Sequence, residues 1–212
     1  PRRVAVVIPA AWPALVLALD HVLHRENRGG GPSVAHVPQI AIEEAVRLGA
    51  DAVKTMLNMG QPDRRAFAEN VSALARYAEE CRRWEMPLMI EPYLWGEAVP
   101  ADPVARAEMN ADGARIAVEL GADILKVEVG ADPERFRTLV AASPVPVVVL
   151  GGPKRATQRE TLADIVAAAE AGAVGLTIGR NVWQHPDPVK MTQALSIAMR
   201  ARDLDAALAA LA

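Results

Sequence analysis

The chain has 212 residues, of which 51% are hydrophobic and 23% charged, and its formal net charge is -3. Basic residues do not gather in any one stretch, so nucleic acid and anionic membranes are excluded as the main partners. One cysteine, Cys81, permits no internal disulfide. Without a signal peptide or a membrane-length apolar run, the sequence predicts a cytoplasmic protein.

Apolar runs of strand length recur along the chain, and segments with helical periodicity separate most of them. We expect seven strands, at residues 3–9, 14–20, 51–57, 87–93, 123–129, 146–152 and 174–180. Alternation of strand and helix predicts a parallel sheet with crossover helices. Three of the helices end in LGA, LGA and AGA just before a strand, which is typical of a glycine C-cap in a short loop.

The fold class that this order predicts is α/β, as a (β/α)8 TIM barrel in a single domain over residues 1–212. No G-x-G-x-x-G follows the first strand, so a doubly wound dinucleotide fold is disfavoured. Such a barrel has eight strands in about 250 residues, and the link between the first two predicted strands is too short for a crossover helix. We therefore hypothesise that one N-terminal strand and its helices are missing between about Ala10 and Trp12, by deletion or omission.

Polar side chains occupy one face of the three middle strands. Side chains alternate along a strand, so in DILKVEV the face of Leu125 and Val127 is apolar, whereas Lys126 and Glu128 share the other face. On the two preceding strands, the same alternation places three more polar residues on this face: Lys54, Glu91 and Tyr93. A structural barrel would place branched aliphatic residues there. The sequence thus predicts a polar site in the lumen.

Two interpretations of these residues stay open. Lys54 and Lys126 could pair with Glu91 and Glu128 in a buried ion network that only specifies register. Alternatively, Lys126 is a nucleophile whose free amine is favoured by desolvation and by the nearby ammonium of Lys54, while Glu91 or Tyr93 moves protons. Arginine outnumbers lysine 19 to four in this chain, so a position that stays lysine is a candidate for amine chemistry.

The last two strands predict an anion site. PVVVLGGPK ends in Gly151 and Gly152, and VGLTIGRN ends in Gly179 and Arg180. Glycines at strand ends let backbone N–H groups approach an anion closely, and an arginine offers a bidentate fork. A phosphate site in the last two loops is a recurrent barrel feature.

The histidines lack the spacing of a metal site, so we expect no metal and no cofactor. No two of them share a strand face beside carboxylates. The pair Asp20 and His21 follows a strand and could hold substrate hydroxyls at the barrel mouth, or Asp20 could simply cap a loop.

The chain resembles the Schiff-base (class I) aldolases, a group that includes archaeal-type fructose-bisphosphate aldolase and tagatose-bisphosphate aldolase. The segments that carry the resemblance are GADAVKTMLN, PLMIEPYLWG, GADILKVEVG, PVPVVVLGGPK and GAVGLTIGRNVWQHPDPVKM. The resemblance implies that Lys126 forms the imine. It also implies that Gly151, Gly152, Gly179 and Arg180 grip a phosphate.

This chain mixes features of two branches of the group. Lys54 and Glu91 look like the tagatose-bisphosphate branch, whereas Tyr93 looks like the archaeal-type branch. The group's Asp-His-Gly after the first strand is replaced here by IPAAWP, which fits the missing-segment hypothesis.

We therefore expect a metal-independent lyase that cleaves or forms a carbon–carbon bond of a sugar phosphate through an imine on Lys126. A homo-oligomer is the expected assembly. Two alternatives stay open, which are a transaldolase-like or acyl-transfer reaction on the same scaffold and a sugar-phosphate-binding protein without turnover.

Overall fold

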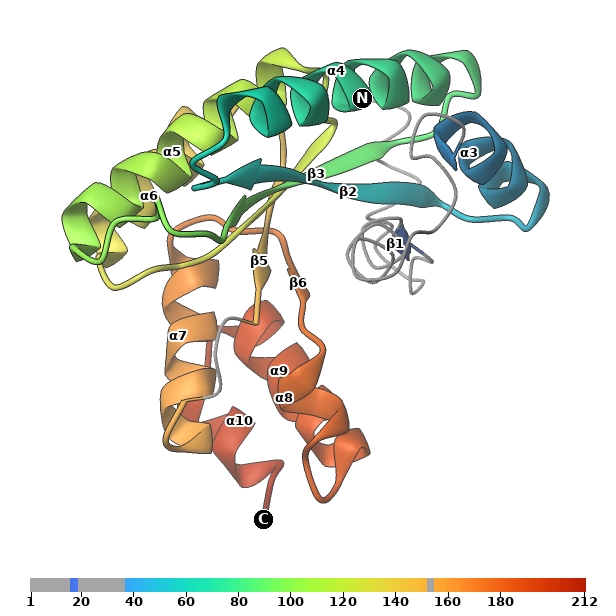
Figure 1. Cartoon of the computed structure of the whole chain (residues 1–212). Helices are drawn as coiled ribbons and strands as arrows, with labels where there is room; N and C mark the ends of the chain where they lie inside the picture. Colours follow the sequence, from blue (N-terminus) through green and yellow to red (C-terminus); the bar gives the residue numbers. More distant parts are fainter. Residues whose placement is uncertain (1–15, 19–36, 152–154) are drawn as a thin grey trace. The chain divides into compact units, whose positions relative to one another are not determined.

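The computed structural model describes residues 16–18, 37–151 and 155–212 (Figure 1). Its contacts divide the chain into two compact units. The first comprises residues up to Pro100 together with Asp112–Leu125, and the second comprises Ala101–Ala111 and Lys126–Ala212. The predicted strand at 3–9 and the hypothesis about residues 10–12 lie outside the described residues.

The first unit is built on parallel strands that follow one another in sequence order. Its elements are β1 (Val16–Ala18), α3 (Val37–Arg47), β2 (Ala52–Met59), α4 (Arg64–Arg83), β3 (Leu88–Leu94), the last part of α5 (Pro103–Glu119) and the start of β4 (Ile124–Val127). Strand β2 pairs in parallel with both β1 and β3, and β3 pairs in parallel with β4. Sequential parallel pairing with intervening helices is the arrangement that the sequence predicts.

The core of this unit lies between β2, β3 and helix α4. Figure 1 shows α4 running along one face of the two strands, and α4 and β2 are in contact. Leu57, Leu88 and Ile90 are completely buried on that face, as is Leu74 of α4. The helix starts at Asp63, whose side chain accepts a hydrogen bond from the Arg65 N–H at 2.8 Å. Capping satisfies a backbone donor that would otherwise lack an intrahelical partner.

The second unit combines two strands with several helices. Its elements are the first part of α5 (Pro103–Glu119), the end of β4, α6 (Pro133–Ala142), β5 (Val147–Leu150), α7 (Gln158–Glu170), β6 (Gly175–Thr177), α8 (Arg180–Trp183), α9 (Pro188–Ala201) and α10 (Leu204–Ala209). Strands β5 and β6 are parallel neighbours (Figure 1). Helices α7, α9 and α10 contact one another. None of the helices in the described ranges is long and apolar enough to cross a membrane.

The recurrent Leu/Ala-Gly-Ala ends of three helices form the C-caps that the sequence predicts. In each, the glycine has a positive φ, and its N–H donates to the carbonyl three residues earlier. The following alanine donates to the carbonyl five residues earlier, as in Ala50 to Ala45. These two bonds define the Schellman motif, and they turn each helix directly into the next strand.

Gly96→Ala is expected to lower the free energy of unfolding by more than Gly49→Ala does. Both glycines have positive φ, +123° and +77° respectively, a conformation that costs an L-residue about 1–2 kcal/mol. A Cβ on Gly96 would also overlap the carbonyl oxygen of Gly60, whereas a Cβ on Gly49 meets nothing within 4 Å. Denaturant unfolding of the two variants measures the difference. Equal losses would show that crowding at Gly96 has no energetic effect.

Candidate active site

A buried ion pair joins the two central strands of the first unit. The Lys54 ammonium lies 2.5 Å from the Glu91 carboxylate, and the two side chains are only 6% and 7% exposed. Burying either charge alone would cost several kcal/mol, so each residue depends on the other. The pair therefore places a fixed, desolvated cation and anion on one face of β2 and β3.

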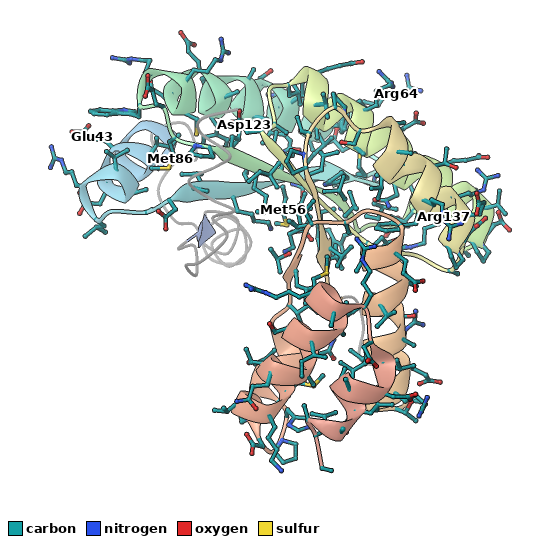
Figure 2. All side chains as sticks on the ribbon, turned by 180° about the vertical axis from the view of Figure 1, so that it is seen from behind. Glu43, Met56, Arg64, Met86, Asp123 and Arg137 are labelled. Carbon is teal, nitrogen blue, oxygen red and sulfur yellow. The ribbon has the colours of Figure 1, made fainter. Side chains whose placement is uncertain are left out.

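Strand register explains why these residues meet. Lys54 is the register partner of Met89 and Met56 is that of Glu91, so all four have the parity opposite to the core residues. Figure 2 shows Met56 on the side of β2 away from α4. Tyr93 follows on the same parity of β3 and is half-buried. The structure thus brings Lys54, Glu91 and Tyr93 to one face, as the sequence predicts.

Asp123 sets the register of β4 against β3. Its N–H donates to the carbonyl of Leu88 at 2.8 Å, and its carboxylate accepts the Leu88 N–H at 2.9 Å. These two hydrogen bonds fix the pairing of Met89 with Ile124 and of Ile90 with Leu125. Lys126 follows Leu125 in β4, so alternation gives it the parity of Ile124. Ile124 is the register partner of Met89, and Met89 has the same parity as Glu91 in β3.

Glu128 is held by a residue that the sequence analysis did not single out. Both oxygens of its carboxylate accept hydrogen bonds from Arg106 of α5, at 2.8 and 2.9 Å. Asn110, also from α5, donates to the Glu128 backbone carbonyl at 3.2 Å and is 5% exposed. The hydrogen bonds that Arg106 donates to the Glu128 carboxylate raise the pKa of Arg106, so this guanidinium stays charged. The bidentate pair anchors the chain two residues after Lys126.

The turn after β5 and the turn after β6 are tied together in the second unit. Asn181 Nδ2 donates to the carbonyl of Gly151 at 3.0 Å, and the Gly179 carbonyl accepts the N–H of Val182 at 2.8 Å as α8 begins. A Cβ on Gly151 would lie 3.0 Å from Ile178, so a larger residue would push the two turns apart. Gly151 therefore permits a close approach between neighbouring strand ends.

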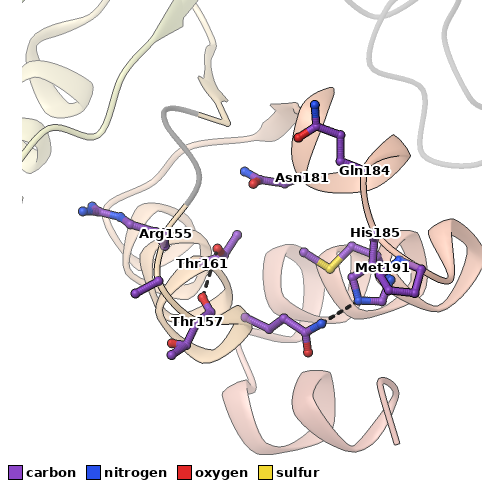
Figure 3. Close-up of a pocket in the computed structure, with 10 residues that line it drawn as sticks. Arg155, Thr157, Thr161, Asn181, Gln184, His185 and Met191 are labelled. Carbon is purple, nitrogen blue, oxygen red and sulfur yellow. Dashed lines mark hydrogen bonds between the residues drawn. The ribbon is translucent and has the colours of Figure 1, made fainter.

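A polar cavity of about 240 Å³ lies beside these turns (Figure 3). Its walls come from the residues around the start of α7, from α8 and from the segment between α8 and α9, and they include Arg155, Gln158, Asn181 and His185. Gln158 Nε2 and His185 Nε2 are 2.6 Å apart, and Arg155 bonds Asp164 at 2.7 Å. Its hydrogen-bonding groups come from the segments that follow β5 and β6 in the chain, and ligands of parallel barrels bind in such segments between a strand and the next helix.

Residues 9–185 match a described family, the DeoC/LacD family aldolase. The chain belongs to this aldolase family. The match spans most of the chain and includes the Lys54–Glu91 pair, Lys126 and both glycine turns.

Two curated relatives illustrate the range of this aldolase family. A 2-amino-4,5-dihydroxy-6-oxo-7-(phosphonooxy)heptanoate synthase of Streptomyces griseus is 39% identical over 74% of this chain and 55% of its own length. Fructose-bisphosphate aldolase class 1 of Thermoproteus tenax is 38% identical over 76% of this chain and 59% of its own. The chain thus spans a little over half the length of these relatives.

Solved structures of aldolases share the fold. An archaeal fructose 1,6-bisphosphate aldolase superposes with a TM-score of 0.74 at 27% identity, over 93% of this chain and 98% of that one. Another, whose catalytic lysine is covalently bound to the carbinolamine intermediate of its substrate, has a TM-score of 0.71 at 32% identity, over 92% and 74%. The predicted fold class is therefore confirmed: it is an α/β fold with parallel strands, which the TIM-barrel aldolases share.

Some of the predicted site residues lie beyond what the structure describes. Asp20 and Gly152 are outside the described residues, so their proposed substrate and phosphate contacts stay predictions. The backbone of Arg180 begins α8 directly after Gly179. Within the described ranges, no group of three histidine, cysteine, aspartate or glutamate side chains could hold a metal ion.

Proposed function

We propose that this aldolase-family chain cleaves and forms a carbon–carbon bond of a ketose phosphate through an imine on Lys126. The observation that carries the proposal is the Lys54–Glu91 pair. An amine must be unprotonated to attack a carbonyl, whereas the Lys54 side chain is engaged by the buried Glu91 carboxylate at 2.5 Å. Lys126 is half-buried in β4, and the resemblance of its segment GADILKVEVG to the Schiff-base aldolases implies that it is the imine-forming lysine.

The proposed reaction begins with attack of the Lys126 amine on the ketone carbon. The resulting carbinolamine loses water to form an iminium ion. The bond between the third and fourth carbons then breaks as a base removes the hydroxyl proton of the fourth carbon, so the aldehyde leaves and the electron pair forms an enamine. Protonation of the enamine and hydrolysis of the imine release the second product and restore the amine.

Tyr93 and Glu91 are the proposed proton-transfer groups. Tyr93 is half-buried and lies two residues beyond Glu91 on the same face of β3, so its hydroxyl is the more accessible of the two groups. The Lys54–Glu91 pair supplies fixed charges that need no rearrangement as charge develops, which is the most effective form of electrostatic stabilisation. Metal is not required for any of these steps.

The phosphate is proposed to bind at the turns that follow β5 and β6. Support comes from the bond between Asn181 and the Gly151 carbonyl and from the polar cavity beside it. Gly152 and Arg180 complete this grip, and Asp20 is proposed to bind a substrate hydroxyl. A single barrel domain, a cytoplasmic location and a homo-oligomeric assembly belong to the same proposal.

Borohydride reduction in the presence of a ketose phosphate is expected to trap a stable adduct on Lys126. Reduction converts the imine to a secondary amine, so peptide mass spectrometry identifies both the residue and the chemistry. Fructose 1,6-bisphosphate and dihydroxyacetone phosphate serve as probes. Cleavage that a chelator stops, with no adduct on any lysine, would overturn the proposal, and binding without turnover or an adduct would favour a sugar-phosphate-binding protein.

A further inference from the structure

Lys126 lies near the end of a short strand. Strand β4 has only four residues, and Lys126 is the last but one of them. The chain then passes Glu128 and reaches Gly130, where φ is +73°, before α6 begins at Pro133. Backbone near a strand end has few ladder hydrogen bonds and opens more easily than the interior of a strand. The position of Lys126 therefore depends on what holds the residues just after it.

Helix α5 holds these residues from one face of its first turns. Arg106 and Asn110 are four residues apart, so their side chains lie on the same side of the helix. Arg106 donates hydrogen bonds to both oxygens of the Glu128 carboxylate, and Asn110 donates one to the Glu128 backbone carbonyl. We call Arg106, Asn110 and Glu128 the Glu128 clamp. All three residues belong to the second compact unit, as does Lys126.

The ion pair of the clamp is partly shielded from water. The Arg106 side chain is 36% exposed and the Glu128 side chain 20%. Solvent and salt screen such a pair less than a fully exposed one. Its two parallel N–H···O bonds fix direction as well as distance. Together with the bond from Asn110, they hold both the side chain and the backbone of Glu128.

Asn110 has a cost that a purely structural role does not explain. The residue is 5% exposed, and among the described residues its Oδ1 has no hydrogen-bond partner. A buried acceptor without a partner is destabilising, and asparagine is a poor residue for the interior of a helix. An apolar residue would avoid both penalties but would lose the bond to the Glu128 carbonyl. Residues that lower stability in this way are typical of functional sites.

We infer that Arg106 and Asn110 are positioning residues, which act through Glu128 to hold the backbone at Lys126 so that its amine is correctly placed to attack a ketone. The inference rests on the proposed imine at Lys126. Attack requires the reacting atoms to be about 3–3.5 Å apart and aligned, and a misplacement of about 1 Å can lower the rate about 10²-fold. In this role neither residue touches the substrate.

The test compares Arg106→Met and Asn110→Leu with a matched control, Arg135→Met. Arg135 of α6 donates to Glu108 of α5 at 3.2 Å. The control therefore removes a bond between the same helix and the segment after β4, but it leaves the Glu128 clamp intact.

Both clamp variants should slow the chemical step more than they weaken binding. We expect Arg106→Met and Asn110→Leu to lower kcat, and the rate at which the borohydride-reducible adduct forms on Lys126, about tenfold or more. KM for fructose 1,6-bisphosphate should change less than about threefold, because the substrate contacts are retained. Arg135→Met should change none of these values. An unchanged kcat in both clamp variants, or an equal loss in Arg135→Met, would overturn the inference.

Stability separates a positioning role from a structural one. Asn110→Leu removes the unpartnered buried oxygen and introduces a better helix former. The denaturant midpoint of this variant should therefore stay the same or rise while kcat falls. If kcat falls only in proportion to the loss of stability across the variants, the clamp has a structural role and the inference fails.

Hydrogen exchange distinguishes failure of this inference from failure of the proposed function, because it needs no substrate. Arg106→Met should speed deuterium uptake in peptides that cover residues 126–129 about fivefold or more, and Arg135→Met should not. Unchanged uptake in Arg106→Met would show that the clamp does not hold this backbone. If uptake rises as expected but the unaltered chain forms no adduct on Lys126, the proposed imine is wrong, and the role of the clamp in attack fails with it.

Discussion

Replacement of Lys126 by methionine will abolish both carbon–carbon cleavage and borohydride trapping. Methionine fills a similar volume without an amine, so β4 keeps its packing while the nucleophile is lost. Removal of a catalytic nucleophile lowers kcat by on the order of 10⁴- to 10⁶-fold. Lys126→Arg should be equally inactive, because a guanidinium retains the charge but cannot form an imine. Cleavage assays and mass spectrometry of the reduced protein measure the two losses.

Lys190→Met is the matched control for that experiment. Lys190 lies on α9, where its ammonium donates to the Ala212 carbonyl at 2.9 Å on the surface. Its replacement should leave cleavage and trapping unchanged. An adduct that persists in Lys126→Met would contradict the assignment of Lys126. An adduct found on Lys54 in the unaltered chain would mean that the Lys54–Glu91 pair opens during the reaction.

The sequence predicted the polar face because strand parity is a local property. Lys54, Glu91 and Tyr93 could be placed on one side of the sheet from alternation alone, and the register of β2 with β3 confirms it. The three glycine C-caps could be predicted for the same reason, since the residues that form each Schellman motif are adjacent in sequence. The family resemblance was also predicted, and the match over residues 9–185 confirms it.

Partners that are remote in sequence could not be predicted. Strand alternation left Glu128 as a possible member of a buried ion network with the two lysines, whereas the structure pairs it with Arg106, 22 residues earlier on a helix. Nothing in a chain with 19 arginines marks that one as bonded to a strand end. Asn181 was missed as well, because its contact with the Gly151 carbonyl depends on how two loops meet. The only sequence signal was the glycine beside each loop, which indicated a close approach without naming its partner.

Single substitutions in the Lys54–Glu91 pair will destabilise the protein strongly. Lys54→Met leaves the Glu91 carboxylate buried without its cation, and Glu91→Leu leaves the Lys54 ammonium buried without its anion. Breaking a buried pair in this way costs about 3–5 kcal/mol. The double variant Lys54→Met/Glu91→Leu removes both charges and should regain most of the lost stability. Denaturant unfolding of the four proteins gives the coupling energy.

Activity in the double variant then separates the two interpretations that the sequence left open. If the pair only specifies register, the stable double variant should cleave substrate at nearly the normal rate. If the pair supplies fixed charges to the reaction, the double variant should be stable and still lose at least about 10²-fold in kcat. We expect the second result, since a barrel needs only apolar side chains to fill its lumen.

An exposed pair provides the control for the energetic part of this cycle. Arg115 and Glu119 of α5 are 2.7 Å apart, and each side chain is 61% exposed. Water solvates both charges, so Arg115→Ala should cost no more than about 0.5 kcal/mol and leave kcat unchanged. A similarly small cost for Lys54→Met would mean that water enters the Lys54–Glu91 site when the cation is removed. The remaining carboxylate would then be solvated, and the case for a fixed, desolvated charge pair would fail.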